Sequence, residues 1–544
     1  MDQWREFQAR VRDAVTSPVL TYEQRVMALA KLAENALPYP EVPPEARQLM
    51  EAGVINDLEE GHAPYRPRYI LPDYQRFLKQ GSGFLEVPPP ADLPEAINAL
   101  TILYHAVPSI TGMPVYLGDV DTLLEPYTAG VSDAELAGQI RLFLRLADRL
   151  FPDGFVHAVL GPRETRTGHA IFAAERGLRQ VVPNWTLKYD PAITPDELLL
   201  DAIRTVFEVG KPHFANHPAM VRDLGDKYSV ASCYNSLPLG GGSYTLARLN
   251  LRRLVEHALE QGHSRETILS TDLPHAARML LAVMEARIRF IVEEARFFQH
   301  SFLASEGLVA PDRFTAMFGL VGLAEAVNLL MAPGNGNRME YGKSPAPRYG
   351  KNPEARELAM AIMGRLREAA ATPVPYCEAS GGRALLHAQA GVTEDADVTP
   401  GVRIPPGDEP ELIEHLLWAA PFHAYFPTGI SDIFHFDHTV RENPAAVADI
   451  IKGAFKSGMR EFTFNLADGE FVRVTGYLVR RADLEAVARG RASRYDTSAL
   501  AKDSVPNQGV LRRAIRRVVA GEMGDPGKGQ GEIPMKSPEP GARP

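Results

Sequence analysis

The stretch FVRVTGYLVRR, residues 471–481, decides the fold of this chain, because it sets a glycine inside a run that otherwise reads as a buried strand. Valine, phenylalanine and tyrosine favour a strand, whereas glycine weakens one. Gly476 stands between Thr475 and Tyr477. One interpretation is structural, a bulge or a close approach of two backbones. The other is chemical and depends on the hydrogen atoms of the glycine Cα.

Loss of a hydrogen atom from a glycine Cα leaves a carbon-centred radical between an amide nitrogen, which donates electron density, and a carbonyl group, which withdraws it. The centre must become planar for this delocalisation, and a side chain would crowd it, so glycine fits best. S–H and glycyl Cα–H bonds are close enough in strength for reversible hydrogen exchange with a cysteine thiol. Gly476 is therefore a candidate site for a radical stored in a dry interior.

The segments upstream predict strands alternating with helices. REFTFNL and EFVRVTGYLV read as two strands joined by a hairpin at residues 467–469. YSVASCYNSLPLGGGSYTLARLNLRRLV reads as strand or loop, cysteine, turn, strand and helix. Apolar residues at helical spacing predict helices over residues 195–209, 274–303 and 353–370.

Composition narrows the class of protein. The chain has 544 residues, and its net charge of −10 argues against a broad nucleic-acid surface. The N-terminus MDQWREFQARVRDAV carries charges throughout, and no run of 18 apolar residues occurs. We therefore expect a soluble cytoplasmic protein whose partners are small molecules, with no nucleic acid and no membrane among them.

Two cysteines, Cys233 and Cys377, are the only thiols. In a long chain without a signal peptide they are expected to stay reduced, and they cannot form a four-cysteine zinc site. Each is either a small buried hydrophobe or a thiol with chemistry. The pair His435 and His438 could ligate zinc on a helix, but on a strand the rings face opposite sides. We expect no metal site, with substrate hydrogen bonding as the alternative role of His435.

Several motifs in order resemble the glycyl radical enzymes. RVTGY, Arg473 to Tyr477, is similar to their glycine signature, although Thr475 replaces the more usual serine, cysteine or alanine. The segment from Pro183, with its asparagine-containing strand, helix and Gly-x-Pro-x-Phe-x-Asn run, resembles a second family pattern, and RYGKNPEARELAMAIM a third. ASCYNSLPLGGG and PSITGMPVYLGDVDTLLEPY look most like the YjjI-type members, and the loop around Cys233 is more distantly similar to anaerobic ribonucleotide reductases.

The resemblance implies a fold and a domain layout. We expect an α/β structure, a ten-stranded barrel of two antiparallel five-stranded half-sheets surrounded by helices, with the cysteine and glycine loops meeting inside. Residues 1–64 are then an N-terminal helical segment and residues 65–520 the barrel domain. Residues 521–544, rich in glycine, proline and charge, read as a disordered tail.

The resemblance also assigns candidate roles. It implies that Gly476 carries the radical and that Cys233, on a mid-chain loop far upstream, carries the thiyl that takes hydrogen from a substrate. Arg473 and Tyr477 are interpreted as supports of the glycine loop. A thiyl cysteine must keep its hydrogen, so apolar burial that raises its pKa is useful, and native Cys233 should alkylate slowly.

Other residues are possible substrate-side contacts. Cys377 is the weaker thiol candidate, and with Glu378 it reads as part of a substrate loop; Asn235 and His435 complete the set. In the family, pyruvate formate-lyase types carry two adjacent cysteines, eliminases place a glutamate two residues after the cysteine, and anaerobic ribonucleotide reductases carry a zinc-binding cysteine cluster. This chain has none of these, since Asn235 stands at the glutamate position. The substrate therefore stays open.

The resemblance implies partners and conditions. A radical S-adenosylmethionine activase would install the radical, no cofactor would be bound, the enzyme would work without oxygen, and the chain would form a homodimer. Two alternatives remain: a non-catalytic cytosolic small-molecule-binding protein on the same barrel, in which Gly476 is only a tight bend, and a radical enzyme like the ribonucleotide reductases.

Overall fold

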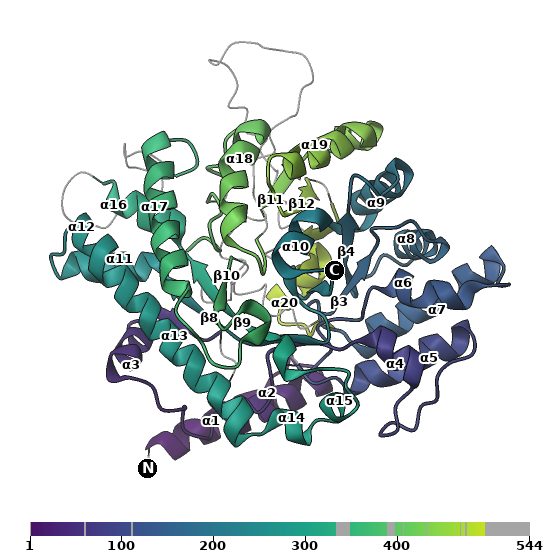
Figure 1. The fold of residues 1–544 in the computed structure, drawn as a ribbon, viewed down its shortest axis with the longest axis horizontal. Helices are drawn as coiled ribbons and strands as arrows, with labels where there is room; N and C mark the ends of the chain where they lie inside the picture. Colours follow the sequence, from purple (N-terminus) through teal and green to yellow (C-terminus); the bar gives the residue numbers. More distant parts are fainter. Residues whose placement is uncertain are drawn as a thin grey trace, which may run out of the picture.

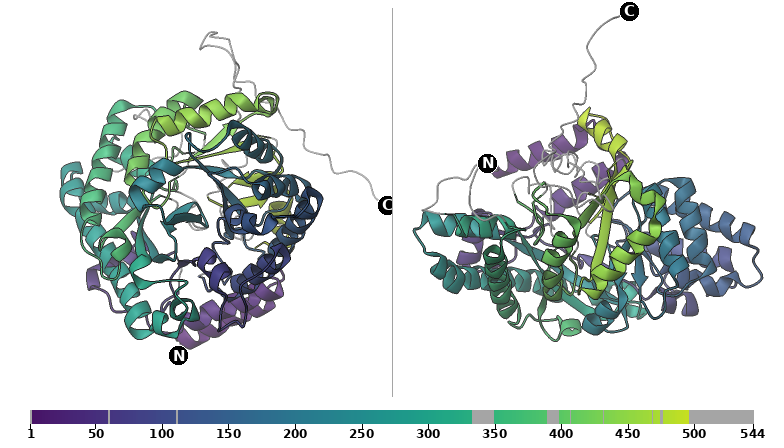
Figure 2. Two further views of the ribbon diagram at one scale, coloured as in Figure 1. Left: turned by 45° about the vertical axis from the view of Figure 1, so that its right-hand side comes forward. Right: turned by 90° about the horizontal axis from the view of Figure 1, so that it is seen from above.

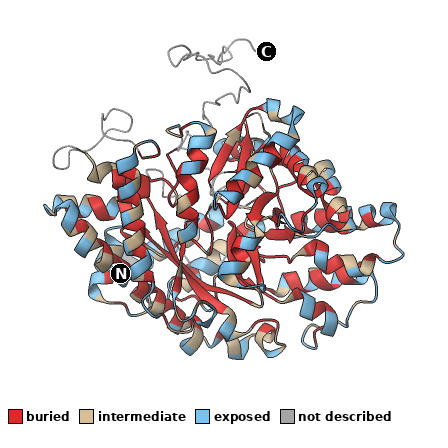
Figure 3. Cartoon of the chain, turned by 45° about the horizontal axis from the view of Figure 1, so that its top comes forward, coloured by how far each residue is buried: buried red, intermediate tan, exposed pale blue. Residues whose placement is uncertain are grey.

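A computed structural model describes residues 2–58, 61–109, 112–332, 349–388, 398–405, 407–430, 432–467, 469–473 and 476–495. Helices surround two sheets whose strands occupy the middle of the molecule (Figure 1 and Figure 2, left). The strands are almost wholly buried, whereas the helices show exposed faces on their outer sides (Figure 3). None of the helices in the described ranges is long and apolar enough to cross a membrane.

One five-stranded sheet has the order β1-β8-β9-β10, with β2 also paired to β8. Its strands are β1 (Ile55–Asn56), β2 (Tyr69–Leu71), β8 (Gly241–Asn250), β9 (Phe314–Val321) and β10 (Ala384–His387). The ladders β8–β9 and β9–β10 are parallel, while β1 and β2 run antiparallel to β8. The segment predicted as N-terminal and helical therefore also supplies a strand to this sheet.

The other five-stranded sheet has the order β11-β12-β5-β4-β3. Its strands are β3 (His157–Leu160), β4 (Asn184–Tyr189), β5 (His213–Asn216), β11 (Ile433–Phe436) and β12 (Glu461–Leu466). Only the β12–β5 ladder is antiparallel. Long crossovers connect the parallel neighbours, because parallel strands cannot be joined by a tight turn.

The expected α/β class and the two five-stranded sheets are present, but a closed ten-stranded barrel is not. Each sheet is mixed, and no ladder joins one sheet to the other among the described residues. Two small hairpins lie outside both sheets: β6 (Tyr228–Ala231) with β7 (Asn235–Pro238), and β13 (Phe471–Arg473) with β14 (Leu478–Arg480).

The predicted helices are largely present. Helix α17 (Pro353–Ala370) has the predicted bounds, and α9 (Asp196–Val209) begins one residue late. The run predicted over 274–303 is instead α13 (Leu273–Arg289), a short π-helical turn and a break, where Arg296 adopts φ 52°. The remaining long helices are α1 (Asp2–Thr16), α2 (Tyr22–Glu34), α3 (Pro44–Glu51), α5 (Leu93–Ala106), α7 (Asp133–Leu150), α8 (Arg166–Leu178), α10 (His217–Leu224), α11 (Leu251–Glu260), α16 (Leu323–Leu330), α18 (Leu412–Ala419), α19 (Pro444–Lys456) and α20 (Arg481–Ala488).

The predicted hairpin at residues 467–469 is wrong. Strand β12 pairs with β11 and β5, and the hairpin lies one step later, between β13 and β14. The side chain of Asn465 takes the place of a ladder: its Nδ2 donates to the Arg473 carbonyl at 3.2 Å, and its Oδ1 accepts from the Arg473 N–H at 3.0 Å. The run EFVRVTGYLV is therefore two short strands with Gly476 in their connection.

The sheet β11-β12-β5-β4-β3 has one polar and one apolar face, since residues alternate along each strand. The apolar face packs against helices, as the ring contacts Phe207–Phe464 and Tyr189–Phe455 show. The opposite face, here called the polar face, carries buried polar side chains at positions that share a side in the ladders: His157, Asn184, Thr186, Lys188, His213, Glu461, Thr463 and Asn465. The predicted tail, residues 521–544, lies outside the described residues.

Candidate active site

Cys233 lies at the tip of the β6–β7 hairpin. Residues 228–238 pair as an antiparallel ladder from Tyr228 opposite Pro238 to Ala231 opposite Asn235; the sequence pattern predicts a strand or loop before the cysteine but not the strand β7 after it. Ser232 and Tyr234 both have left-handed backbones, with φ 46° and φ 62°. Non-glycine residues rarely adopt this region, and such strain collects at functional sites. The tight turn therefore places Cys233 at the end of a two-stranded hairpin.

Gly476 lies against this tip. A Cβ atom added to Gly476 would stand 2.4 Å from Cys233 Cβ and 2.5 Å from Cys233 Cα. Any side chain at position 476 would therefore overlap the cysteine. Cys233 is buried and packs in a small apolar cluster with Val472, Tyr477 and Val479 of the glycine hairpin. The two residues expected to exchange hydrogen are thus in direct contact, away from water.

Burial raises the pKa of the Cys233 thiol to about 12, and the charges of Arg68 and Arg403 only partly oppose this effect. The raised pKa keeps the sulfur as a neutral thiol at neutral pH. This state suits hydrogen-atom transfer, because a thiolate has no hydrogen to exchange. It is the opposite of what a nucleophilic cysteine requires.

We expect iodoacetamide to label Cys233 slowly in the folded protein. Because the folded pKa of about 12 lies above the usual range of a cysteine thiol, the labelling rate should still be rising between pH 8 and pH 10. Mass spectrometry of the Cys233 peptide measures this rate, and the urea-unfolded chain provides the fast reference. Rapid labelling of the native protein at neutral pH would contradict the neutral-thiol interpretation.

Arg473 and Asn184 hold the glycine hairpin. The Asn184 Nδ2 donates to the Gly476 carbonyl at 3.1 Å, and Arg473 Nη1 donates to Asn184 Oδ1 at 3.2 Å. Arg473 Nη1 also donates to the hydroxyl of Tyr234, which follows the cysteine. All four residues are buried, so the hydrogen bonds are not in competition with water. The predicted supporting role of Arg473 has this geometric basis.

Tyr234 docks the cysteine hairpin onto the polar face. Its ring lies 3.6 Å from the His213 ring, centroid to centroid, and 6.0 Å from that of His157. Burial lowers the pKa of both histidines well below the usual range, so both rings are neutral at neutral pH. Thr186 bridges them, at 2.6 Å from His157 Nε2 and 2.8 Å from His213 Nδ1.

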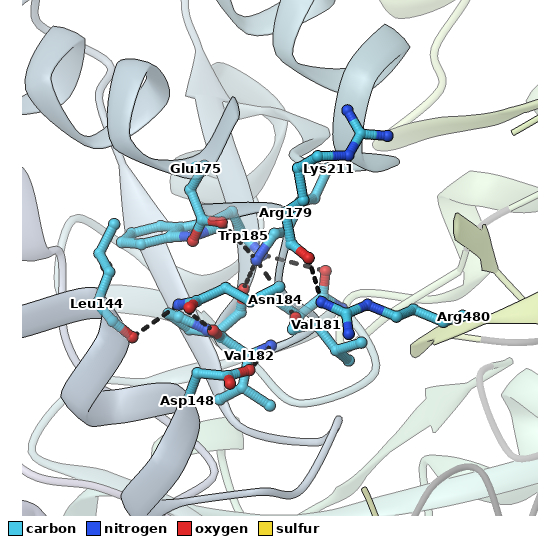
Figure 4. Close-up of polar contacts among 12 residues, drawn as sticks. Leu144, Asp148, Glu175, Arg179, Val181, Val182, Asn184, Trp185, Lys211 and Arg480 are labelled. Atoms are coloured by element: carbon cyan, nitrogen blue, oxygen red, sulfur yellow. Dashed lines mark hydrogen bonds and ion pairs between the residues drawn. The ribbon is translucent and has the colours of Figure 1, made fainter. Parts of the chain in front are cut away.

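A second buried network lies beneath the segment that carries Asn184 (Figure 4). Lys211 pairs with Glu175 at 2.9 Å, and both side chains are buried. Lys211 Nζ also donates to the Pro183 carbonyl at 2.7 Å, and Trp185 Nε1 donates to Glu175 at 2.7 Å. These bonds fix the backbone on both sides of Asn184. The arginine of β14, Arg480, donates to the Arg179 carbonyl close by.

Asn235 has an unusual environment. Its side chain is fully buried, and neither its Oδ1 nor its Nδ2 has a hydrogen-bond partner in the described part of the chain. A buried amide without partners costs about 1–3 kcal/mol, so such a group commonly has a functional explanation. Since Asn235 follows Cys233 by two residues, this amide is the strongest candidate for a substrate contact among the predicted set.

The other predicted residues are placed as follows. Tyr477 is buried and packs edge-on against Phe155, with ring centroids 5.3 Å apart. His435 is half-buried on β11, in register with Asn465 and so on the polar face. Cys377 is buried in the main hydrophobic core, not in the cluster of Cys233, and Glu378 beside it is exposed. The structure thus separates the two thiols into different clusters.

No group of three or more metal-ligating side chains occurs among the residues that the structure describes. His435 lies on a strand and His438 begins a 3₁₀ turn, so the two do not share a helix face. The sequence missed Asn184, Tyr234 and His213 as site residues. The feature that could have indicated Asn184 is the alternation of polar and apolar side chains in NWTLKY, residues 184–189.

Gly476, which has no side chain, lies in buried contact with Cys233, whose thiol is neutral, and this is the arrangement expected of a glycyl radical enzyme. The family model described as "Glycyl radical enzyme YjjI-like" matches residues 20–516. The chain belongs to this family. It is 47% identical to YjjI of Escherichia coli K12 over 511 residues, which cover 94% of this chain and 96% of that protein. A Haemophilus influenzae protein is 41% identical over 517 residues, covering 93% and 97%.

Solved structures support the fold. An anaerobic ribonucleotide reductase has a TM-score of 0.63 at 14% identity, covering 87% of this chain and 83% of that one. A Roseburia inulinivorans structure titled for 1,2-propanediol dehydration has a TM-score of 0.67 at 12% identity, covering 93% and 88%. The hydroxyproline dehydratase of Clostridioides difficile has a TM-score of 0.62 at 12% identity, covering 94% and 88%. At these identities the likeness shows the shared fold alone.

Proposed function

We propose that Gly476 stores a radical on its Cα and that Cys233 carries the thiyl that takes hydrogen from a small-molecule substrate. The observation that carries this proposal is the buried contact between the two residues, where a glycine Cβ would lie 2.4 Å from the cysteine Cβ. Membership of the glycyl radical family supports it independently. A binding protein that used Gly476 only as a bend would have no need for a neutral thiol against the bend.

The hydrogen atom moves as a unit. The Gly476 Cα radical takes the hydrogen of the Cys233 S–H bond, which restores the glycine and leaves an electron on sulfur. The thiyl then takes a hydrogen atom from a substrate carbon, and the product radical recovers it from the thiol at the end of the cycle. The burial of both residues keeps water out of this exchange.

The substrate is proposed to meet the amide of Asn235. This amide offers a donor and an acceptor without internal partners, which suits a hydroxyl, carbonyl or amide group close to the carbon that loses hydrogen. An amide cannot act as a general base at neutral pH. A lyase reaction of the kind named for two structural neighbours, a dehydration, would therefore need its proton acceptor elsewhere on this chain or on the substrate.

The proposed radical must be generated by a separate enzyme. We propose a radical S-adenosylmethionine activase that removes a hydrogen atom from Gly476, with no cofactor resident in this chain and a homodimer as the working assembly, under anaerobic conditions. Because Gly476 is covered by Cys233, the β13–β14 hairpin must leave its place for this step.

Air exposure tests the proposal directly. After anaerobic treatment with an activase, electron paramagnetic resonance should show a glycyl doublet, and oxygen should then cut the chain at Gly476. Gel electrophoresis should reveal a C-terminal fragment of the 68 residues that follow Gly476 in the 544-residue chain. Untreated protein is the control. An intact chain and a silent spectrum, with an activase shown to cleave S-adenosylmethionine in the same mixture, would refute the radical.

A further inference from the structure

Asn184 occupies one position in a closed circuit of contacts between the two loops. Gly476 touches Cys233, and the residue after the cysteine, Tyr234, accepts a hydrogen bond from Arg473. Arg473 donates to Asn184, and Asn184 donates back to the carbonyl of Gly476. The circuit leads from the glycine Cα to the glycine carbonyl and includes the cysteine hairpin.

The orientation of the Asn184 amide is fixed by its neighbours. Two donors face its Oδ1: Arg473 Nη1 at 3.2 Å and the backbone N–H of Trp185 at 3.1 Å. The oxygen must accept from both, so the NH₂ group is the one that faces the Gly476 carbonyl. A flipped amide would put NH₂ against two donors and oxygen against oxygen. Asn184 is therefore a donor to Gly476, and the guanidinium of Arg473 polarises it.

We propose that Asn184 is a radical-stabilising residue, whose hydrogen bond to the Gly476 carbonyl favours the stored glycyl radical over the cysteine thiyl. This inference rests on the proposed function. Delocalisation of the glycyl radical moves electron density onto its carbonyl oxygen. A donor aimed at that oxygen stabilises the radical more than it stabilises the closed-shell glycine, and it does so most strongly in a dry interior.

Hydrogen exchange measures this balance. One hydrogen atom passes from the Cys233 thiol to the Gly476 Cα, and no proton or electron is left over. In deuterium oxide the thiol carries deuterium, so repeated passage replaces the remaining Cα hydrogen and collapses the glycyl doublet to a singlet. The rate of collapse reports how readily the stored radical becomes a thiyl.

We expect Asn184→Ala to speed this collapse about fivefold, the shift in an equilibrium that one ordinary hydrogen bond sustains. The doublet splitting should also widen, because more spin stays on the Cα. Asn465→Ala is the matched control: Asn465 is also a buried amide bonded to the glycine hairpin, but it contacts the backbone of Arg473 and not the Gly476 carbonyl. It should leave the splitting unchanged.

Asn184→Asp is a second variant that controls for misfolding of Asn184→Ala. It has the same shape and keeps an acceptor for Arg473 and the Trp185 N–H, but as a carboxylate it has no donor for the glycine carbonyl. It should reproduce the faster collapse. Unchanged splitting and exchange in both Asn184 variants, beside a normal wild-type doublet, would overturn this inference alone. A wild-type protein that gives no doublet with a competent activase would overturn the proposed function and the inference together.

Discussion

Replacing Gly476 with alanine should eliminate the radical and all turnover. The added Cβ would lie 2.4 Å and 2.5 Å from two atoms of Cys233, one of them backbone, so the cysteine and glycine loops must also separate. Overpacking of this kind costs about 1–3 kcal/mol of folding free energy. Electron paramagnetic resonance after activation should show no doublet, and urea unfolding should show the lower stability.

The matched control is Gly453→Ala. Gly453 lies in α19, and a Cβ there would meet nothing within 4 Å. This variant should keep the doublet and full stability. A doublet of wild-type intensity in Gly476→Ala would place the radical on another residue and refute the proposed site.

Cys233→Ser should retain the stored glycyl radical but lose turnover. The serine O–H bond is too strong for the glycyl radical to break, so the doublet should form and persist while turnover falls to background. The doublet should also stay a doublet in deuterium oxide, because the route for exchange is gone. Serine is close to cysteine in size, so the fold should survive, which circular dichroism and urea unfolding can check.

Cys377→Ser distinguishes the two thiols. Cys377 is buried in the main core, and burial raises its pKa to about 12 as well, so thiol acidity alone does not tell the two apart. We expect this variant to keep the doublet, its exchange in deuterium oxide and turnover. Loss of turnover in Cys377→Ser, with exchange intact, would instead assign Cys377 to the substrate side.

The pair at the centre of the candidate site was predicted from sequence motifs and not from composition or periodicity. RVTGY and the cysteine before a glycine-rich bend pointed to Gly476 and Cys233, and the structure brings these residues into contact across more than two hundred positions of chain. Local pattern also predicted α9, α17, and the strand and helix that follow the glycine-rich bend, because helical periodicity and turn residues act over short distances.

The sequence did not predict which strands distant in the chain pair with one another. The hairpin at residues 467–469 looked plausible because two strand patterns flank a turn signal, yet β12 finds its partners in β5 and β11. Asn465 then satisfies the backbone of Arg473 with a side chain, which no propensity encodes. For the same reason the expected closed barrel was not deducible, since closure depends on edges that are distant in the chain.

The polar residues around the glycine hairpin could be seen in the sequence, but their contacts could not be predicted from it. Asn184 lies in a strand whose polar side chains alternate with apolar ones, and this pattern predicts a face lined with polar groups. What that face contacts depends on the docking of Tyr234, and only the folded molecule shows it. The unpartnered amide of Asn235 is likewise a property of its surroundings and not of the residue type.

The buried guanidinium of Arg473 has a consequence for activation. Its Nε and Nη2 find no partner among the described residues, and burial lowers its pKa, which reflects the cost of keeping this cation dry. If the hairpin leaves the interior to meet an activase, as proposed, the same cation would regain its hydration. The free energy gained by hydrating Arg473 would partly offset the free energy of the contacts that the hairpin loses. Because one hairpin cannot occupy both places, the proposed activation implies that a molecule does not turn over substrate while its radical is being installed.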